Sequence, residues 1–302
     1  MEQSKLSNRV VATLLASLAT LLWGSAYPFI KLGYEVFNVG PHDTGGKIAF
    51  AGARFAVAGL LVLIFHAIKG GKGERRGSMW GHLLLLGLVQ TTIHYFLFYV
   101  GVSYTTGAKS AILNSVSVFF SALLAHLLYP TDRLSWRKGI GIIIGFLAII
   151  LVNLEANFEF SFSFRGEGLL VITALLTGLG ALYSKKISQK VNPVFISGVQ
   201  LTFGGIVLLL LSLLFGFSIP KANLKGYLIL LYLALVSAVA FSIWTTLLKH
   251  NRASSITIFY FLIPIFGTLL SGIILKEDIF RAQYYLSLPI VAVGIYLVNR
   301  DK

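Results

Sequence analysis

Polar and aromatic side chains recur at helical spacing within one apolar stretch of the sequence. Gln90, His94 and Phe98 are four residues apart and therefore share one face of a helix. A histidine on such a face can bind a carboxylate or take up a proton near neutral pH. The alternative is a neutral ring that a neighbouring threonine or backbone carbonyl satisfies. Asn114 and Ser117 form a similar stripe in the next apolar stretch, so two facing stripes are expected to line one cavity.

One arginine, Arg54, lies inside another apolar stretch, where a charge is costly and usually has a partner or a function. It could supply a fixed positive charge for an anionic or zwitterionic ligand. It could also be structural, donating to helix-end carbonyls or to Asp43. The equivalent position in the internal repeat described below holds the neutral Gln200, and this favours the structural interpretation. No Asp or Glu lies inside an apolar stretch, so His94 is the one deep candidate for carrying a proton.

The composition places these residues in a membrane protein. Hydrophobic residues make up 56% of the chain and charged residues 12%, with a mean hydropathy of +0.83. Soluble domains use charged residues at about a quarter of positions. The absence of cysteine excludes a disulfide framework and a thiolate metal site. The sequence has no His-Glu-x-x-His or Gly-x-Ser-x-Gly motif, so we expect no catalytic residue, metal or cofactor. Nor does it repeat a segment typical of a channel filter.

Ten apolar stretches approach or exceed the roughly 20 residues that cross a bilayer. The first is too long for a signal peptide and is expected to stay in the protein. The fifth and tenth are short and are expected to begin within the preceding loops. The ten stretches are Val10–Tyr34, Lys47–Ala67, Trp80–Val102, Gly107–Tyr129, Gly139–Asn153, Gly168–Ile187, Val194–Phe215, Gly226–Leu248, Ala253–Leu275 and Tyr284–Asn299.

The loop charges predict the orientation of these ten helices. With a cytoplasmic N-terminus, the inner segments hold 16 basic and four acidic residues, and the outer segments hold seven of each. This asymmetry follows the positive-inside rule and predicts that both termini are cytoplasmic. It also accounts for most of the net charge of +14, which therefore gives no indication of nucleic-acid binding.

The chain repeats itself at an offset of 146 residues. Residues 48–153 align with residues 194–299 without a gap, and both segments end in Leu-Val-Asn. We therefore expect a first repeat over residues 1–153, an outer linker over 154–166 and a second repeat over 167–302. Five helices in each repeat give the two repeats opposite orientations. In inverted repeats of this kind the substrate binds near the midplane, at the interface between the repeats.

The internal symmetry predicts a second wall of the cavity from the eighth and ninth helices. Its candidate residues are Ser237, Phe241, Trp244 and Thr245 in the eighth helix and Thr257, Tyr260 and Pro264 in the ninth. In the third helix Tyr99 and Tyr95 extend the aromatic surface. Pro28 and Pro264 lie inside apolar stretches, where they would kink a helix and act as hinges.

The motifs resemble those of the drug/metabolite transporter superfamily. Trp23-Gly24-Ser25 in the first stretch and Arg54 in the second carry this resemblance, and the run from Pro264 through Lys276-Glu277 to Gly294 is similar to its EamA-type branch. The resemblance implies transport of small metabolites, often amino acids. It also implies that the first and sixth helices surround the cavity, which adds Tyr27 and Tyr183 to the candidates.

The expected function is therefore that of a secondary transporter in a bacterial inner (plasma) membrane, working by alternating access. Its expected partners are the lipid bilayer and a small molecule, an amino acid or related carboxylated compound, with no nucleic acid. The protein is expected to be a monomer or a homodimer. The aromatic residues leave organic cations and nucleobase-like compounds open as cargo. A sensor without transport activity and a membrane-embedded enzyme are the alternatives from other classes.

Overall fold

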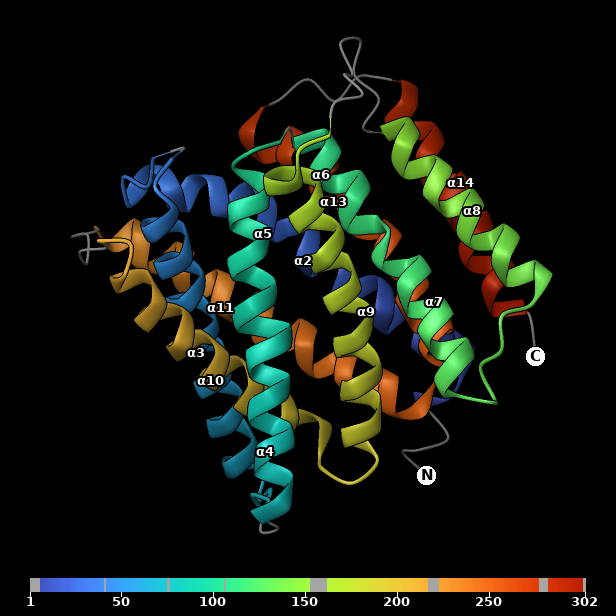
Figure 1. Ribbon diagram of the computed structural model, residues 1–302, viewed down its shortest axis with the longest axis horizontal. Coiled ribbons are helices and arrows are strands. Elements are labelled where there is room, and N and C mark those ends of the chain that lie inside the picture. The colour runs from blue at the N-terminus through green and yellow to red at the C-terminus, as the bar shows by residue number, and fades with distance from the viewer. Residues whose placement is uncertain are drawn as a thin grey trace.

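The structure is a computed structural model that describes residues 6–40, 42–74, 77–105, 107–152, 162–216, 223–276 and 282–300. These residues form helices and connecting loops, and none of the described residues is in a strand (Figure 1). Glu277 of the EamA-like run and most of the predicted 154–166 linker lie outside the described residues.

The helical segments follow the predicted stretches closely. In chain order they are α2 (Arg9–Val36), α3 (Thr44–Ile68), α4 (Gly77–Leu86), η1 (Gly87–Ile93), α5 (His94–Val102), α6 (Gly107–Ser115), α7 (Ser117–Leu128), α8 (Trp136–Val152), η2 (Phe164–Gly168), α9 (Leu169–Ser188), α10 (Pro193–Leu213), α11 (Leu224–His250), α12 (Ala253–Thr257), η3 (Ile258–Phe261), α13 (Leu262–Leu275) and α14 (Ala282–Arg300).

Eight helices among the described residues are long and apolar enough to cross a membrane, counting segments that continue one another as one. The predicted fifth and tenth stretches are also helical. However, α8 has 17 residues and α14 has 19, and neither is among these eight. An all-helical, multi-span architecture is thus confirmed, whereas the count of ten crossings stays a prediction.

Local capping explains where several helices begin. The side chain of Asn8 accepts a hydrogen bond from the backbone N–H of Val10 at 2.9 Å and caps α2. Asn192 caps α10 in the same way and is followed by Pro193 at the first helical position, where proline loses no helical hydrogen bond. Asp43 caps α3 by accepting from the N–H of Gly46 at 2.7 Å. The Asp43 carboxylate is therefore used as the N-terminal cap of α3.

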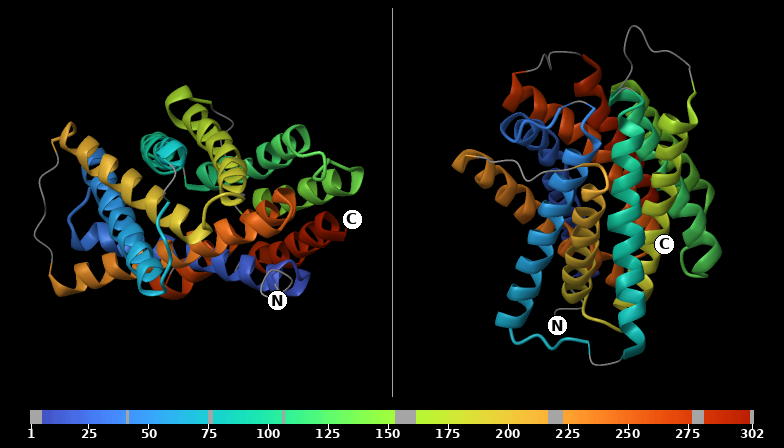
Figure 2. Two further views of the ribbon diagram at one scale, coloured as in Figure 1. Left: turned by 90° about the horizontal axis from the view of Figure 1, so that it is seen from below. Right: turned by 60° about the vertical axis from the view of Figure 1, so that its left-hand side comes forward.

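Two pairs of helices lie on opposite sides of the molecule. α3 packs along α10 on one side, and α8 packs along α14 on the other (Figures 1 and 2). The α3–α10 contact depends on glycine: a Cβ at Gly59 would lie 2.2 Å from the backbone N of Thr202, and a Cβ at Gly205 would lie 2.3 Å from that of Ala56. Such close approach is typical of helix packing in membranes. The helices α2, α5, α9, α11 and α13 lie between these pairs.

Three of the long helical segments depart from regular α geometry near the centre of the molecule. The predicted fourth helix is broken at Val116, which separates α6 from α7. The predicted ninth helix contains the 3₁₀ segment η3, which ends three residues before Pro264, and this proline cannot donate a backbone hydrogen bond. The third helix contains the π-helix η1, for which the sequence has no proline or other evident signal.

Candidate functional site

A cavity of about 150 Å³ lies between the two helix pairs. Its walls come from α2, α3, the η1–α5 segment, α6, α7, α9, α11, η3 and α13. The lining residues are Trp23, Ala26, Tyr27, Ile30, Arg54, Gln90, His94, Tyr95, Phe98, Tyr99, Asn114, Ser115, Ser117, Thr177, Phe241, Tyr260 and Ile263. Most of the residues predicted to bind substrate or anchor charge are among them.

One wall is formed by α5 and the end of η1. Gln90, His94 and Phe98 line the cavity together, as their four-residue spacing predicts. The rings of His94 and Phe98 are stacked, with centroids 6.2 Å apart and planes inclined by 12°. Tyr95 and Tyr99 lie on the adjacent part of the helix face and widen this aromatic wall.

His94 is held by helix α9. Its Nδ1 lies 3.2 Å from the carbonyl oxygen of Thr173 and 3.4 Å from the hydroxyl of Thr177. Because a carbonyl oxygen can only accept, Nδ1 carries a proton, and in the neutral ring Nε2 is then an acceptor. The backbone partner that we considered as the alternative to a functional role is therefore present. The ring still lines the cavity, with Nε2 available to a ligand that donates a hydrogen bond.

Arg54 also lines the cavity and is only 4% exposed. Its Nε donates to the hydroxyl of Ser237 on α11 at 2.8 Å, and its guanidinium carbon lies 5.0 Å from the centre of the Phe55 ring. The described residues supply no hydrogen bond to either Nη group and no carboxylate within ion-pair distance. The expected partners, helix-end carbonyls or Asp43, are not the ones observed: Asp43 caps α3, and Ser237 on another helix bonds Arg54 instead. The choice between a structural and a binding role for Arg54 stays a prediction.

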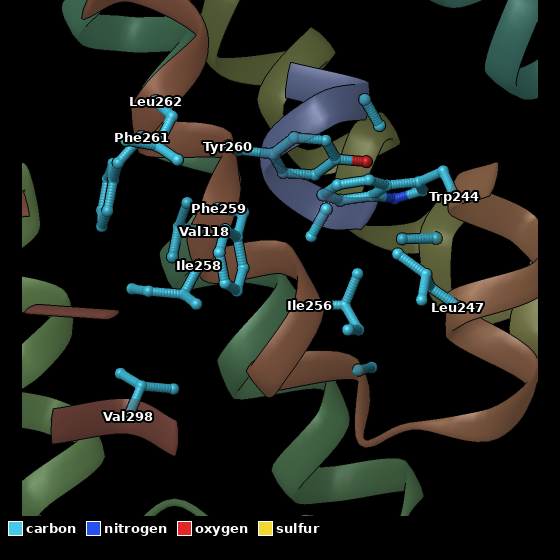
Figure 3. Close-up of a cluster of buried hydrophobic side chains, with 14 of the residues drawn as sticks. Val118, Trp244, Leu247, Ile256, Ile258, Phe259, Tyr260, Phe261, Leu262 and Val298 are labelled. Atoms are coloured by element: carbon cyan, nitrogen blue, oxygen red, sulfur yellow. The ribbon is translucent and has the colours of Figure 1, made fainter. Parts of the chain in front are cut away.

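Trp23 is at the centre of the second aromatic wall. Its ring centroid lies 5.3 Å from that of Phe241 and 6.0 Å from that of Tyr260. Trp244 is 2% exposed and does not line the cavity. Instead it stacks on Tyr260, with centroids 4.5 Å apart, and supports that ring from behind (Figure 3). The expected contribution of Trp244 is therefore indirect.

Tyr183 lies away from the cavity. Its hydroxyl forms a hydrogen bond of 2.6 Å with Nδ1 of His82, on α4. Tyr183 is five residues before the end of α9, whereas Thr177 faces the cavity nearly two turns earlier. The expectation from the resemblance therefore holds for the sixth helix but not for this residue. Tyr27, the corresponding choice on the first helix, does line the cavity.

Sequence reasoning missed some of the lining residues. Thr177 and Ser115 carry no signal of their own, since single small hydroxyl residues are common on any membrane helix face. Tyr95, in contrast, was expected as part of the aromatic surface next to His94, and it lines the cavity. Pro28 and Pro264 do not line the cavity, although each is adjacent to a residue that does.

A second cluster of buried charge lies between α7 and α8, far along the chain from Arg54. Lys138 donates from Nζ to the Asp132 carboxylate at 2.7 Å and to the Arg133 carbonyl at 3.0 Å. Asp132 also accepts from the backbone N–H of Ser254 at 2.9 Å and from its hydroxyl, which joins this loop to α12. Burial alone would raise the pKa of the Asp132 carboxyl, but the hydrogen bonds from Lys138 and Ser254 hold that pKa below its usual range.

Comparison with known proteins identifies the family. The sequence profile of the EamA-like transporter family matches residues 10–154 and 164–300. The chain belongs to the EamA-like transporter family. The resemblance to the drug/metabolite transporter superfamily is thereby confirmed.

Uncharacterized transporters of three organisms match almost the whole chain. An uncharacterized transporter of Archaeoglobus fulgidus is 27% identical, covering 96% of this chain and 97% of its own. YvbV, an uncharacterized transporter of Bacillus subtilis, is 27% identical over 95% of this chain and 90% of its own. YedA, an uncharacterized inner membrane transporter of Escherichia coli, is 25% identical over 93% and 88%. A crystal structure with 16% identity has the same fold, with a TM-score of 0.81 over 96% of both chains.

The family and the helices together establish a multi-pass membrane transporter. Large apolar side chains on the outer surface fit this assignment, because they face lipid in a membrane protein. Leu14, Ile68 and Leu214 are examples, with 64%, 77% and 80% of their surface exposed.

Proposed function

We propose that this EamA-like protein is a secondary transporter that carries a small carboxylated metabolite across the plasma membrane by alternating access, with both termini in the cytoplasm. An amino acid or a related acid is the cargo that the cavity supports best. The observation that carries this proposal is the guanidinium of Arg54, which faces the cavity without a counter-charge among the described residues.

A buried cation without a counter-charge is unfavourable until a ligand neutralises it. Arginine binds carboxylate through parallel N–H groups, and both Nη groups of Arg54 remain available for such a pair. No acidic residue is among the described residues that line the cavity. An organic cation would meet the aromatic walls but would also be repelled by Arg54, so the cavity disfavours this alternative cargo.

The other groups that line the cavity indicate what the cargo carries besides a carboxylate. Nε2 of His94 can accept a hydrogen bond from a substrate N–H or O–H group. The aromatic rings of Trp23, Phe98 and Tyr260 offer contact area to an apolar or planar moiety. A cavity of about 150 Å³ matches one that holds a benzene-sized molecule, so in this state the cargo is small.

Alternating access is supported by three signs of inverted repeats. The family profile matches two consecutive segments of similar length. The two packed pairs, α3–α10 and α8–α14, each join helices that the offset of 146 residues relates. The break at Val116 and the junction between η3 and α13 at Leu262 also fall on aligned positions. Two similar halves allow two similar packings, one open to each side of the membrane.

The proposal is tested by uptake into proteoliposomes. One pool would contain amino acids and monocarboxylates, the other organic cations and nucleobases, and both would be read by mass spectrometry. We expect uptake or exchange of at least one carboxylate and a large loss in Arg54→Gln. Transport of cations alone, or carboxylate transport that does not depend on Arg54, would contradict the proposed cargo.

A further inference from the structure

Two pairs of polar residues occupy equivalent positions in the two halves of the chain. At the offset of 146 residues, Arg54 aligns with Gln200 and Thr91 aligns with Ser237. Arg54 on α3 is bonded to Ser237 on α11. Gln200 on α10 and Thr91 on η1 lie on the corresponding pair of packed helices. Gln200 and Thr91 thus form a second polar pair at the positions equivalent to Arg54 and Ser237.

Only the first of these pairs is hydrogen-bonded. Gln200 is 1% exposed and Thr91 is fully buried. The side-chain amide of Gln200 has no hydrogen-bond partner among the described residues, at either Nε2 or Oε1. The hydroxyl of Thr91 has none either. Buried polar groups in native proteins nearly always have a partner, so three unpaired atoms at one helix contact need an explanation.

The helices α10 and η1 already approach each other closely enough for Gln200 and Thr91 to bond. A Cβ at Gly87 would lie 3.2 Å from the Cα of Gln200, and a Cβ at Gly204 would lie 2.4 Å from the Cβ of Thr91. The hydroxyl of Thr92, next to Thr91, donates to the carbonyl of Gly204 at 3.0 Å. A bond between Gln200 and Thr91 therefore needs a local change in η1 rather than a new contact between helices.

Helix geometry differs between the two halves at this very position. The Ser237 hydroxyl donates to the carbonyl of Leu233, four residues earlier in regular α-helix. The residue equivalent to Leu233 is Gly87, which begins the π-helix η1. The corresponding bond from Thr91 to Gly87 is absent. A π-helix forms hydrogen bonds between residues five apart rather than four apart, and such segments are frequent at functional sites.

We propose that the bonds Arg54–Ser237 and Gln200–Thr91 alternate during transport. The state described here holds the first. In the state open to the opposite side the halves exchange conformations, so Gln200 bonds Thr91 and Arg54 leaves Ser237. This inference rests on the alternating access of the proposed function. Ser237 and Thr91 are then positioning residues. Ser237 orients the Arg54 guanidinium toward the cargo carboxylate. Loss of the Arg54–Ser237 bond therefore changes the affinity for the cargo when access switches from one side to the other.

The absence of cysteine from the chain provides a direct test. Ala26 lines the cavity, and in an Ala26→Cys variant the introduced thiol is the only one. Labelling by a membrane-impermeant maleimide, in right-side-out and inverted vesicles, would report the fraction of protein open to each side. The background variant is then combined with Ser237→Ala, Thr91→Val or Gln200→Met, each close in shape to the native residue.

The two pairs predict shifts of opposite sign. Ser237→Ala removes a bond from the present state, whereas Thr91→Val and Gln200→Met remove a bond from the other state and also remove unpaired atoms from this one. Each substitution should change the ratio of outer to inner labelling by about fivefold, which is the effect of one hydrogen bond. Thr91→Val with Ser237→Ala should return the ratio toward that of the background.

Ser242→Ala is the matched control on α11, because Ser242 donates only to Ala238 within its own helix. Its labelling ratio should not change. The inference would be overturned if Ser237→Ala shifted the labelling ratio in the same direction as Thr91→Val and Gln200→Met. It would also be overturned if Thr91→Val or Gln200→Met left the ratio unchanged, even with normal carboxylate uptake. Opposite shifts in a protein that takes up no carboxylate would instead support the alternation and contradict the proposed cargo.

Discussion

Arg54 and Lys138 are both buried cations, with 4% and 1% of their surface exposed, but their surroundings differ. Lys138 is bonded to the Asp132 carboxylate and to a backbone carbonyl. Arg54 has one neutral partner, Ser237, and otherwise faces a cavity. A buried charge whose partners are all in the protein holds two segments together. A buried charge whose donors are turned to a cavity is free to bind a ligand. We therefore assign Lys138 a structural role and propose a ligand-binding role for Arg54, on the basis of their partners rather than their burial.

The largest effect is expected when the charge of Arg54 is removed. Arg54→Gln should lower carboxylate uptake roughly a thousandfold, since losing one partner of a buried ion pair costs on the order of 4 kcal/mol. Arg54→Lys should recover only part of it, because the N–H groups of an ammonium diverge from one nitrogen and cannot form the two parallel bonds to a carboxylate that a guanidinium forms. Initial rates of uptake into proteoliposomes measure both.

Arg137→Gln is the control for Arg54, because Arg137 lies at the start of α8 and its guanidinium carbon is 5.5 Å from the Trp136 ring. It should leave uptake within about twofold of the native rate, as surface substitutions usually do. If Arg54→Gln retained a third of the native rate, the distinction between the two buried cations would fail.

The next largest effect concerns stability. Asp132→Asn leaves Lys138 buried without a counter-charge and should lower the free energy of unfolding by about 3 kcal/mol. The double variant Asp132→Asn with Lys138→Met should recover much of that loss, because no uncompensated charge remains. Thermal unfolding in detergent measures this comparison. A double variant no more stable than Asp132→Asn would show that the ion pair itself is not the source of the effect.

The pH dependence of stability tests the same pair. Because the folded-state pKa of Asp132 is lowered, its contribution is fully present above the ordinary carboxyl pKa of about 4 and is lost as the pH falls through the lowered value. The native protein should therefore lose its advantage over Asp132→Asn only below about pH 4. A loss of this advantage between pH 5 and pH 7 would be inconsistent with the hydrogen bonds described.

His94 should have a smaller effect than either charge. His94→Gln removes the acceptor Nε2, and loss of one hydrogen bond corresponds to about fivefold in uptake. The same variant tests whether His94 carries a proton. If uptake by the native protein depends on pH and His94→Gln retains that dependence unchanged, His94 does not couple transport to protons.

Tyr183→Phe should have the smallest effect. Its hydroxyl is bonded to His82, outside the cavity, so uptake should stay within about twofold of the native rate. Tyr27→Phe is the matched comparison, because Tyr27 lines the cavity on the first helix. A larger loss in Tyr183→Phe than in Tyr27→Phe would show that the cavity described here is not where the cargo binds.

The sequence by itself determined the apolar helices, the repeat and one face of the cavity. Hydrophobic length and helical periodicity are local properties, so residue spacing is enough to group Gln90, His94 and Phe98 on one face. Tertiary structure decided which partner each residue meets. Arg54 bonds a serine 183 positions away, Trp244 stands behind Tyr260 rather than beside the cavity, and the π-helix at Gly87–Ile93 has no evident sequence signal. These features depend on how helices rotate and pack against one another, and that packing is set by contacts between distant parts of the chain.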